Sequence, residues 1–411
     1  MNFKDSSRLL KLGILRLSAN RCAIWLLFLI AFLGSCRSDR PSEKEEENNS
    51  TAQDSIVLPP AEEDYEAAEF KWGFINRKGE LAIDARFDDV RAFSEKAAVV
   101  RLGGKWGFIN PEGAVSIPAE YKGAWSFSEG LARVQTFDNK MGFINHNGQF
   151  VVEPKWDDAE DFHSGRAKVR VGEQFGFIDR KGNLSIPATF DYAASFENGM
   201  AKVQTKGSYG LIDTSGRYLI KAAYNSVWAF SEGLARVKKN GKTGFVNPAG
   251  SVVIATQFDA AKDFQEGLAP ARKGEDWGLI DKKGTFVVAP AYTQLWYAGE
   301  GRWCVEKNDK YGCIDATGLM IVPMNFDQLY SFTEGVAPYM FQRLWGLVDK
   351  DGNVITKPQF GLAWPFRDGI ARAAVQGGIA FINRRGEVVI QPNFLDVRDF
   401  DEGLAPAQIY E

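Results

Sequence analysis

The chain has 411 residues, of which 45 % are apolar and 25 % are charged, and this composition excludes an intrinsically disordered chain. Its 41 glycines argue against a helical bundle, because each interior Gly costs a helix about 1 kcal/mol. His146 and His163 are the two histidines, which disfavours His-based catalysis and multi-His metal sites. Outside residues 1–35 the chain has 44 basic and 52 acidic residues, and such an acidic body does not favour binding to nucleic acid.

The N-terminus has the pattern of an export signal. A basic segment over residues 1–21 precedes an apolar run from Ala23 to Phe32, which is too short to cross a bilayer core of roughly 30 Å as a helix. The run ends in Leu33-Gly34-Ser35-Cys36, which resembles the bacterial lipobox. The resemblance implies a signal peptide over residues 1–35 and lipid attachment at Cys36. The alternative is an ordinary secretory signal with an incidental Cys.

Residues 36–64 are predicted to form a flexible acidic tether. The segment is rich in Ser, Glu and Asn, includes three consecutive glutamates at 45–47, and has no apolar periodicity. Acidic residues after a lipidated Cys resemble the surface-export signals of some Gram-negative lipoproteins. We therefore expect an exported protein that is anchored to the outer membrane, in either the periplasmic or the surface-facing leaflet.

Residues 65–411 contain ten copies of one unit with a period of 34 residues. One aromatic position recurs in every unit: Phe87, Tyr121, Trp156, Phe190, Tyr224, Phe258, Tyr292, Phe326, Phe360 and Phe394. A second series precedes Gly in all units but the last, where Ile379 precedes Ala380: Trp72, Trp106, Met141, Phe175, Tyr209, Thr243, Trp277, Tyr311, Trp345 and Ile379. Two series in one register establish a repeat protein.

The local pattern predicts β-strands, although the period also matches helical tetratricopeptide repeats. Each unit contains several Gly, and its apolar runs are short and rich in β-branched and aromatic residues. Every unit carries Asx-x-x-Gly, as in Asn76-Arg77-Lys78-Gly79, a turn that Gly closes with a positive φ. Two-residue turns such as Gly103-Gly104 and Asn240-Gly241 precede it and suit antiparallel hairpins. Each unit is therefore predicted to be a three-stranded meander.

The repeated motif resembles a known family. Lys71-Trp72-Gly73-Phe74-Ile75-Asn76 and Lys105-Trp106-Gly107-Phe108-Ile109-Asn110, together with a Phe-x-Glu-Gly-Leu-Ala element, are similar to the bacterial WG (KWG) repeat. The resemblance covers residues 70–410. It implies a tandem β-rich array in an exported or surface protein, with no common enzymatic activity.

The all-β array could be an open or superhelical stack or a closed, propeller-like toroid. The repeat region begins near the second strand of a three-stranded unit and ends on the first strand of a unit. This offset would let the C-terminal strand complete the first unit and close a ring. A repeat of 34 residues is nevertheless short for a four-stranded blade, and ten units are many for a ring. The open stack is therefore the favoured expectation.

Cys304 and Cys313 are predicted to form a disulfide within one hairpin. If Asn308-Asp309 is its two-residue turn, the two cysteines lie directly opposite each other, at a Cα separation of roughly 4.5–5.5 Å that permits a disulfide. Export would favour oxidation. The alternative is a pair of free thiols packed as small apolar groups.

Two further features could form a binding surface. An acidic residue recurs before the motif Gly, at Glu129, Glu232, Glu266, Glu300, Glu334, Asp368 and Glu402. The series could present a periodic surface to a basic or cation-bridged partner, or it could simply solvate turns. Trp296, Tyr297 and Trp303 crowd one unit and could form a ligand platform, or they could fill the space left where Ala298 replaces the usual Phe.

The sequence predicts no catalytic residues, cofactor or metal site. Gly241-Lys242-Thr243 lacks the preceding Gly of a phosphate loop, and Asp349-Lys350-Asp351-Gly352 lacks the remaining ligands of a calcium loop. We expect a non-enzymatic, lipid-anchored scaffold that binds a protein or glycan at the cell envelope. The alternatives are an envelope hydrolase with a site that spans several units, or a purely structural spacer.

Overall fold

A computed structural model describes residues 70–410 of the chain. The chain divides into two units, Met1–Tyr65 and Glu66–Glu411, and the fold below is that of the second. The expected signal peptide, the lipid-attachment residue Cys36 and the tether over 36–64 lie outside the described residues. No helix in the described segment is both long enough and apolar enough to span a membrane.

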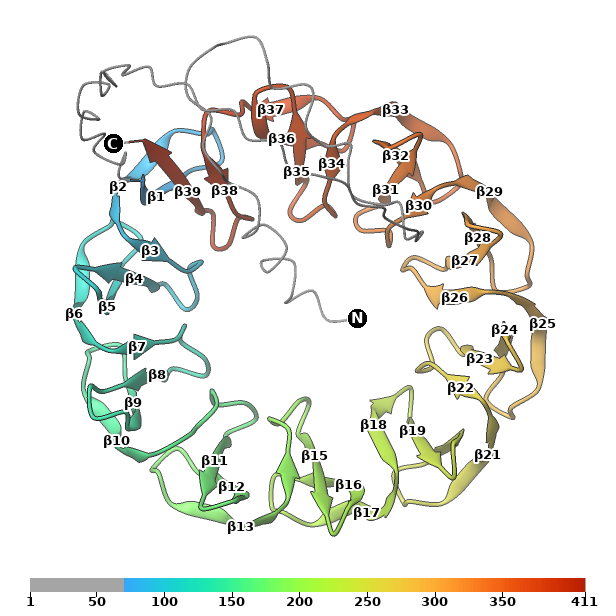
Figure 1. The fold of residues 1–411 in the computed structure, drawn as a ribbon, viewed down its shortest axis with the longest axis horizontal. Helices are drawn as coiled ribbons and strands as arrows, with labels where there is room; N and C mark the ends of the chain where they lie inside the picture. The colour runs from blue at the N-terminus through green and yellow to red at the C-terminus, as the bar shows by residue number, and fades with distance from the viewer. Residues whose placement is uncertain (1–69, 411) are drawn as a thin grey trace, which may run out of the picture. The chain divides into compact units, whose positions relative to one another are not determined.

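Ten small antiparallel sheets, called blades 1 to 10, are arranged in a ring (Figure 1). In hydrogen-bonded order, blade 1 is β2 (Leu81–Phe87), β1 (Phe70–Ile75), β39 (Ala405–Tyr410) and β38 (Asp396–Val397). Blade 2 consists of β3 (Asp89–Val90), β4 (Ala98–Leu102), β5 (Lys105–Ile109) and β6 (Val115–Tyr121). Blade 3 consists of β7 (Gly123–Ala124), β8 (Ala132–Gln135), β9 (Met141–Ile144) and β10 (Phe150–Trp156). Blade 4 consists of β11 (Ala167–Val171), β12 (Gln174–Ile178) and β13 (Leu184–Phe190).

Blades 5 to 10 continue the pattern around the ring. Blade 5 consists of β14 (Tyr192–Ala193), β15 (Met200–Thr205), β16 (Ser208–Asp213) and β17 (Tyr218–Tyr224). Blade 6 consists of β18 (Ser226–Ser231), β19 (Leu234–Lys239), β20 (Lys242–Val246) and β21 (Val252–Phe258). Blade 7 consists of β22 (Ala260–Ala261), β23 (Ala269–Lys273), β24 (Asp276–Ile280) and β25 (Phe286–Tyr292). Blade 8 consists of β26 (Gln294–Tyr297), β27 (Trp303–Lys307), β28 (Lys310–Ile314) and β29 (Met320–Phe326). Blade 9 consists of β30 (Gln328–Leu329), β31 (Val336–Phe341), β32 (Leu344–Asp349) and β33 (Val354–Phe360). Blade 10 consists of β34 (Leu362–Ala363), β35 (Ile370–Val375), β36 (Gly378–Asn383) and β37 (Val388–Ile390).

The predicted strands and turns of the meander are confirmed, but the sheet has one strand more than expected. All ten Asx-x-x-Gly turns form, with the Gly amide donating to the Asx carbonyl, and the Gly has a positive φ in each. The connection after the meander also pairs with the next strand, usually over two residues, as in β3 against β4. In blade 4 this pairing is the isolated bridge between Ala159 and Val169.

The ring is closed, so the favoured expectation of an open stack is wrong and the toroid alternative is correct. The C-terminal strand β39 pairs with β1 over six residues, from Phe70 opposite Tyr410 to Ile75 opposite Ala405. Blade 1 is thus built from both ends of the repeat region. A 34-residue unit can supply a four-stranded blade because its additional strand is so short, and closure removes the free strands at the two ends.

The two aromatic series of the sequence are cross-strand partners. Trp72 lies opposite Phe87 and Trp106 opposite Tyr121, and the equivalent pair forms in nine blades. A second aromatic contact joins neighbouring blades, because Phe108 of blade 2 packs against Phe127 of blade 3 with ring centroids 5.2 Å apart. The core therefore lies between successive blades, as expected for units too small to bury a core alone.

The Gly after the motif Trp is required by a close approach of backbone. A Cβ atom on Gly107 would lie 2.7 Å from the amide nitrogen of Ala119 and the carbonyl oxygen of Ile117, at the bulge of β6. The last unit has Ala380 in place of this Gly, and its third strand does not follow the course seen in the other units. There the third strand, β37, ends at Ile390 and does not reach the aromatic residue Phe394.

We predict that Gly107→Ala destabilises the protein by about 3 kcal/mol, because backbone of β6 must move to admit the methyl group. Gly361→Ala is the matched control. Its Cβ would have Ala374 Cβ, at 3.6 Å, as its nearest contact, so we expect a change within about 0.5 kcal/mol. Urea unfolding of both variants measures the difference. Equal stabilities would contradict this account of the motif Gly.

Candidate functional site

The acidic residues of the Phe-x-Glu-Gly element occupy a tight turn, here called the tip, between the short strand and the next strand of their blades; blades 4 and 5 have Ser164 and Asn198 there. These turns point toward the centre of the ring (Figure 1). Glu129 has a φ of 54°, and its carboxylate accepts hydrogen bonds from the amides of Ser164 and Gly165 in the next blade. Glu232 accepts one from Gly267 in the same way. The same bond to the next blade is also made by Glu95, Glu300, Glu334 and Glu402.

A basic side chain from the next blade pairs with several of these carboxylates. The second residue of the Asx-x-x-Gly turn supplies it, as in the pair between Lys282 Nζ and Glu232 Oε2 at 3.2 Å. Burial would raise the pKa of Glu232, but the bonds from Gly267 and Lys282 outweigh it and lower that pKa. Equivalent ion pairs are Arg77–Asp368, Arg180–Glu129 and Arg384–Glu334, and at the corresponding position His146 Nε2 lies 3.2 Å from Glu95 Oε2. The acidic series therefore joins adjacent blades, which supports a structural role for it.

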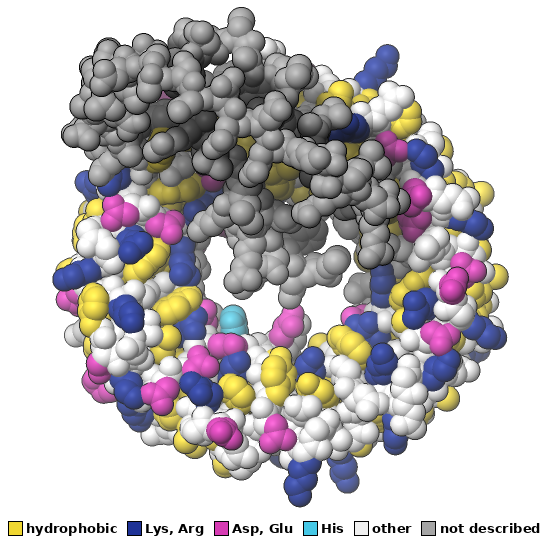
Figure 2. Space-filling view, in the orientation of Figure 1, with side chains coloured by type: hydrophobic (Ala, Val, Ile, Leu, Met, Phe, Trp, Pro, Cys, Tyr) yellow, Lys and Arg dark blue, Asp and Glu magenta, His cyan; other side chains and the backbone are white. Residues whose placement is uncertain are grey.

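A second set of side chains, here called the cation–aromatic belt, runs from blade to blade. It comprises the charged and aromatic residues at two positions of the unit: the residue after the second position of the short strand, and the third residue of the Leu-Ala-Arg-Val strand. Its members are Arg91, Trp125, Arg133, Glu160, Lys168, Lys202, Trp228, Arg236, Lys262, Trp296, Tyr330, Trp364, Arg372 and Arg398. Where the face of the ring is visible in Figure 2, basic, acidic and apolar side chains are interspersed.

Arginines of the belt lie on aromatic rings and reach the following blade. The Arg236 guanidinium lies 4.0 Å from the Trp228 ring centroid, forms an ion pair with Asp263 at 3.1 Å and donates to the Ala261 carbonyl. Arg133, Arg372 and Arg398 repeat this arrangement at three other blade interfaces. A partly desolvated cation–ring contact of this kind contributes up to about 2 kcal/mol.

Two lysines of the belt have no ion pair among the described residues. Lys202 Nζ lies 5.4 Å from the Tyr209 ring centroid, and Lys262 Nζ lies 5.3 Å from that of Trp277. Burial, with a smaller contribution from the charge of Arg236, lowers the pKa of both lysines. Within blades 5 to 7 the belt thus holds three half-buried cations, Lys202, Arg236 and Lys262, of which Arg236 alone has a carboxylate partner, in Asp263. This arc can attract an anionic group.

The proposed platform of Trp296, Tyr297 and Trp303 is a packing cluster for the most part. Trp303 is fully buried, so it offers no surface to a ligand. Tyr297 packs on Trp303 with ring centroids 5.0 Å apart, and its hydroxyl donates to Glu266. Trp296 is half-buried beside Tyr311 and belongs to the belt. The cluster therefore fills the space left by Ala298.

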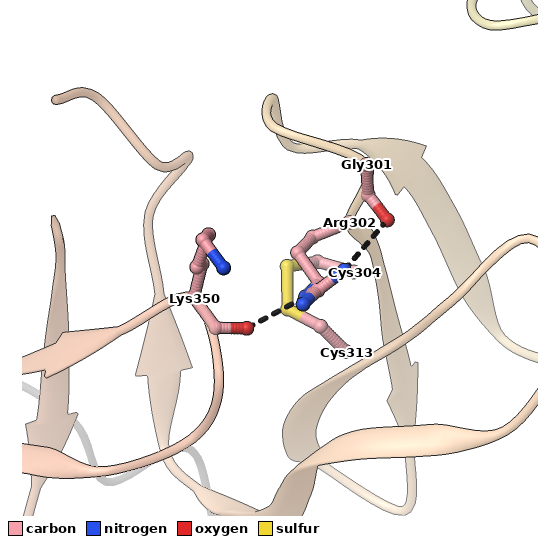
Figure 3. The surroundings of a disulfide bond; sticks show 5 residues. All are labelled: Gly301, Arg302, Cys304, Cys313 and Lys350. Atoms are coloured by element: carbon pink, nitrogen blue, oxygen red, sulfur yellow. Dashed lines mark hydrogen bonds between the residues drawn. A yellow bond between two sulfur atoms is a disulfide. The ribbon is translucent and has the colours of Figure 1, made fainter. Parts of the chain in front are cut away.

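Cys304 and Cys313 lie directly opposite each other in β27 and β28 and are joined by a disulfide, with a Cα–Cα distance of 4.0 Å (Figure 3). This is the register that follows from an Asn308-Asp309 turn. Both cysteines are fully buried, and Arg302 beside them donates to the Lys350 carbonyl of blade 9 at 2.6 Å. The bond therefore stabilises one hairpin at the interface between blades 8 and 9.

We predict that reduction of this disulfide lowers the free energy of unfolding by about 2–3 kcal/mol, the chain-entropy contribution of so short a loop. Urea unfolding with and without dithiothreitol measures it. The double variant Cys304→Ala/Cys313→Ala is the control, and its stability should not respond to the reductant. A wild-type protein that is equally insensitive would contradict the prediction.

Sequence reasoning found the acidic series and the cysteines but missed the belt. The sequence does contain a sign of the belt. An Arg or Lys recurs in the Leu-Ala-Arg-Val strand, and a Trp recurs two residues before the Phe of the Phe-x-Glu-Gly element. Among residues 70–410, no three His, Cys, Asp or Glu side chains form a group that could hold a metal ion.

A family model described as "WG containing repeat" matches ten segments: residues 72–106, 106–140, 141–174, 175–208, 209–242, 244–275, 277–311, 311–341, 345–377 and 380–411. The search of curated proteins gave no match. Similar solved structures include a eukaryotic initiation factor, with 12 % identity over 78 % of this chain and 95 % of its own and a TM-score of 0.41. BamB from Moraxella catarrhalis has 11 % identity over 78 % and 96 %, with a TM-score of 0.30. The computationally designed Ika8 protein has 14 % identity over 64 % and 93 %, with a TM-score of 0.32.

Proposed function

The chain belongs to the WG-repeat family, and from this premise we propose that it is a non-enzymatic binding scaffold at the bacterial cell envelope. The partner is a protein or glycan that carries negative charge, and it contacts the cation–aromatic belt. Export and a lipid anchor at Cys36 in the outer membrane complete the proposal. They rest on the lipobox-like Leu33-Gly34-Ser35-Cys36.

The observation that carries the proposal is the uncompensated charge of the belt in blades 5 to 7. Lys202 and Lys262 are half-buried, lie over aromatic rings and lack ion pairs within the described segment, whereas Lys168 in blade 4 pairs with Glu160. A desolvated cation gains more from an incoming anion than a solvated one, because the local dielectric is lower. The tip carboxylates, in contrast, are already engaged between blades.

The binding proposal is tested by retention of envelope glycans and proteins on the immobilised full chain. Lys202→Met/Lys262→Met should lower retention at least about tenfold, and binding by the wild type should weaken as salt is raised. Lys168→Met is the matched control, because that lysine already has a carboxylate partner. Equal retention by all three proteins would refute the role of the belt. Turnover of the retained polymer would favour the hydrolase alternative.

The anchor is tested separately by metabolic labelling with a radioactive fatty acid and by fractionation. We expect the label in the outer-membrane fraction and its loss in Cys36→Ala. An unlabelled wild-type protein would overturn the anchor while leaving the binding proposal intact.

A further inference from the structure

One tip of the ring departs from the other nine. Blade 2 has Lys96 where every other unit has Gly, and Lys96 has a φ of 62°, directly after Glu95 with a φ of 52°. A residue with a side chain is disfavoured in this left-handed region, whereas Gly is not. The Lys96 amide still donates to Glu402 of blade 1, as the tip Gly amides do elsewhere. The sequence therefore keeps Lys here at a conformational cost, a pattern that marks functional positions.

The turn of blade 3 that lies beside this tip differs from that of blade 4. Blade 4 places Arg180 against the preceding tip, with its Nη2 atom 3.5 Å from the position of a Cβ on Gly130. Blade 3 has the shorter His146 at the equivalent position. Its imidazole lies flat on the Phe127 ring, with centroids 3.8 Å apart, and its Nε2 is 3.2 Å from Glu95 Oε2. The exchange of a long cation for His leaves space beside the blade 2 tip.

That space is a cavity of about 350 Å³ between blades 2 and 3. Its polar lining consists of Glu95, Lys96, Asn110, Ser116 and His146, and its apolar lining is Ala97 and Phe127. Lys96, which departs from the tip Gly of the other units, and His146 both line this cavity. Its volume falls at the lower end of the range for small-molecule sites.

We propose that this cavity binds one acidic sugar residue, a pyranose that carries a carboxylate. The inference deepens the proposed function and rests on it, because it names the chemical class of an envelope ligand for a site outside the belt. Asn110, Ser116 and His146 offer the donors and acceptors that ring hydroxyls require. Lys96 has no ion pair among the described residues, so its ammonium can pair with the sugar carboxylate.

Glu95 opposes an acidic ligand less than a carboxylate without hydrogen-bond partners would. Both of its oxygens already accept the Gly130 amide, at 3.2 and 2.9 Å, and His146 lies against one of them. The carboxylate can still accept from a sugar hydroxyl through its remaining lone pairs. The cavity thus has one cation without an ion pair, one carboxylate engaged by the Gly130 amide and His146, and several neutral hydrogen-bonding groups. The Lys96 ammonium favours a sugar acid over a neutral sugar.

The test is calorimetric titration of the full chain, in detergent, with D-glucuronate, D-glucose and acetate. We expect saturable binding of glucuronate, at least tenfold weaker binding of glucose, and no saturable binding of acetate. Lys96→Gly restores the residue of the other nine units, and His146→Arg introduces the residue that blade 4 has at this position. Each should weaken glucuronate binding at least tenfold while the melting temperature stays equal or rises, so a folding defect cannot explain the loss.

Arg343→Gly is the matched control, because Arg343 also has a positive φ, of 69°, but lies in the β31–β32 turn of blade 9. It should relieve the same backbone strain and leave glucuronate binding unchanged. Absence of saturable glucuronate binding, equal binding of glucose, or unchanged binding by Lys96→Gly would each overturn the proposal. Retention of envelope polymer by the belt would be unaffected by any of these results, so the two proposals fail separately.

Discussion

Trp303→Ala is expected to lower the free energy of unfolding by about 3–5 kcal/mol, the usual cost of emptying the site of a fully buried aromatic side chain. The reason is that the large and the small side chain have exchanged positions in blade 8. The other units have an aromatic tip residue such as Phe93 and a small residue such as Ala98 five positions later. Blade 8 has Ala298 and Trp303 instead, so the large side chain enters the same interface from the next strand.

A double-mutant cycle tests this exchange. Ala298→Phe alone should be destabilising by roughly 1–3 kcal/mol, because Trp303 already fills the space. The pair Ala298→Phe/Trp303→Ala restores the arrangement of the other units and should recover most of the loss. The Trp303 indole Nε1 has no hydrogen-bond partner among the described residues, so volume is its contribution. Urea unfolding of the four proteins gives the coupling energy, and additive effects would contradict the exchange.

The sequence was sufficient for the strands because local rules determine them. The Asx-x-x-Gly turns and the two-residue hairpins fix where each strand begins and ends, and the two aromatic series fix the register, as Trp106 opposite Tyr121 shows. The register of Cys304 and Cys313 followed from the same turn rules. These features depend on residues that are close in the chain, so no knowledge of the ring was needed.

The features that the sequence analysis missed depend on neighbouring blades or on both ends of the chain. A two-residue strand such as β3 is too short to have a hydrophobic period, so the fourth strand was not recognised. Ring closure depends on how far each blade rotates from the last, which no local pattern encodes. The belt was missed because Arg236 gains its role from Asp263 and Ala261 of the next blade. The exposure of Trp303 as a platform was misjudged for the same reason.

Deletion of residues 405–411 is expected to open the ring and to cost more stability than any single substitution considered above. The deletion removes β39, which separates β1 from β38 and leaves unpaired strand edges in blade 1. It also detaches the segment that carries Phe400, which packs on Phe381 of blade 10, and Arg398, which donates to Val90 of blade 2. Both interfaces of blade 1 are therefore weakened together.

The opened protein should show a larger radius of gyration by solution scattering and fast hydrogen exchange in β1, whose amides lose their β39 partners. Its exposed strand edges should also promote association between copies. Because β39 pairs with β1 through backbone bonds over six residues, a synthetic peptide of residues 394–410 added in trans should restore slow exchange in β1. A peptide with Pro at position 407 is the matched control, since it lacks an amide in the middle of the strand. Unchanged exchange in β1 after the deletion would show that closure by β39 contributes little, and that the blades hold the ring through their lateral contacts alone.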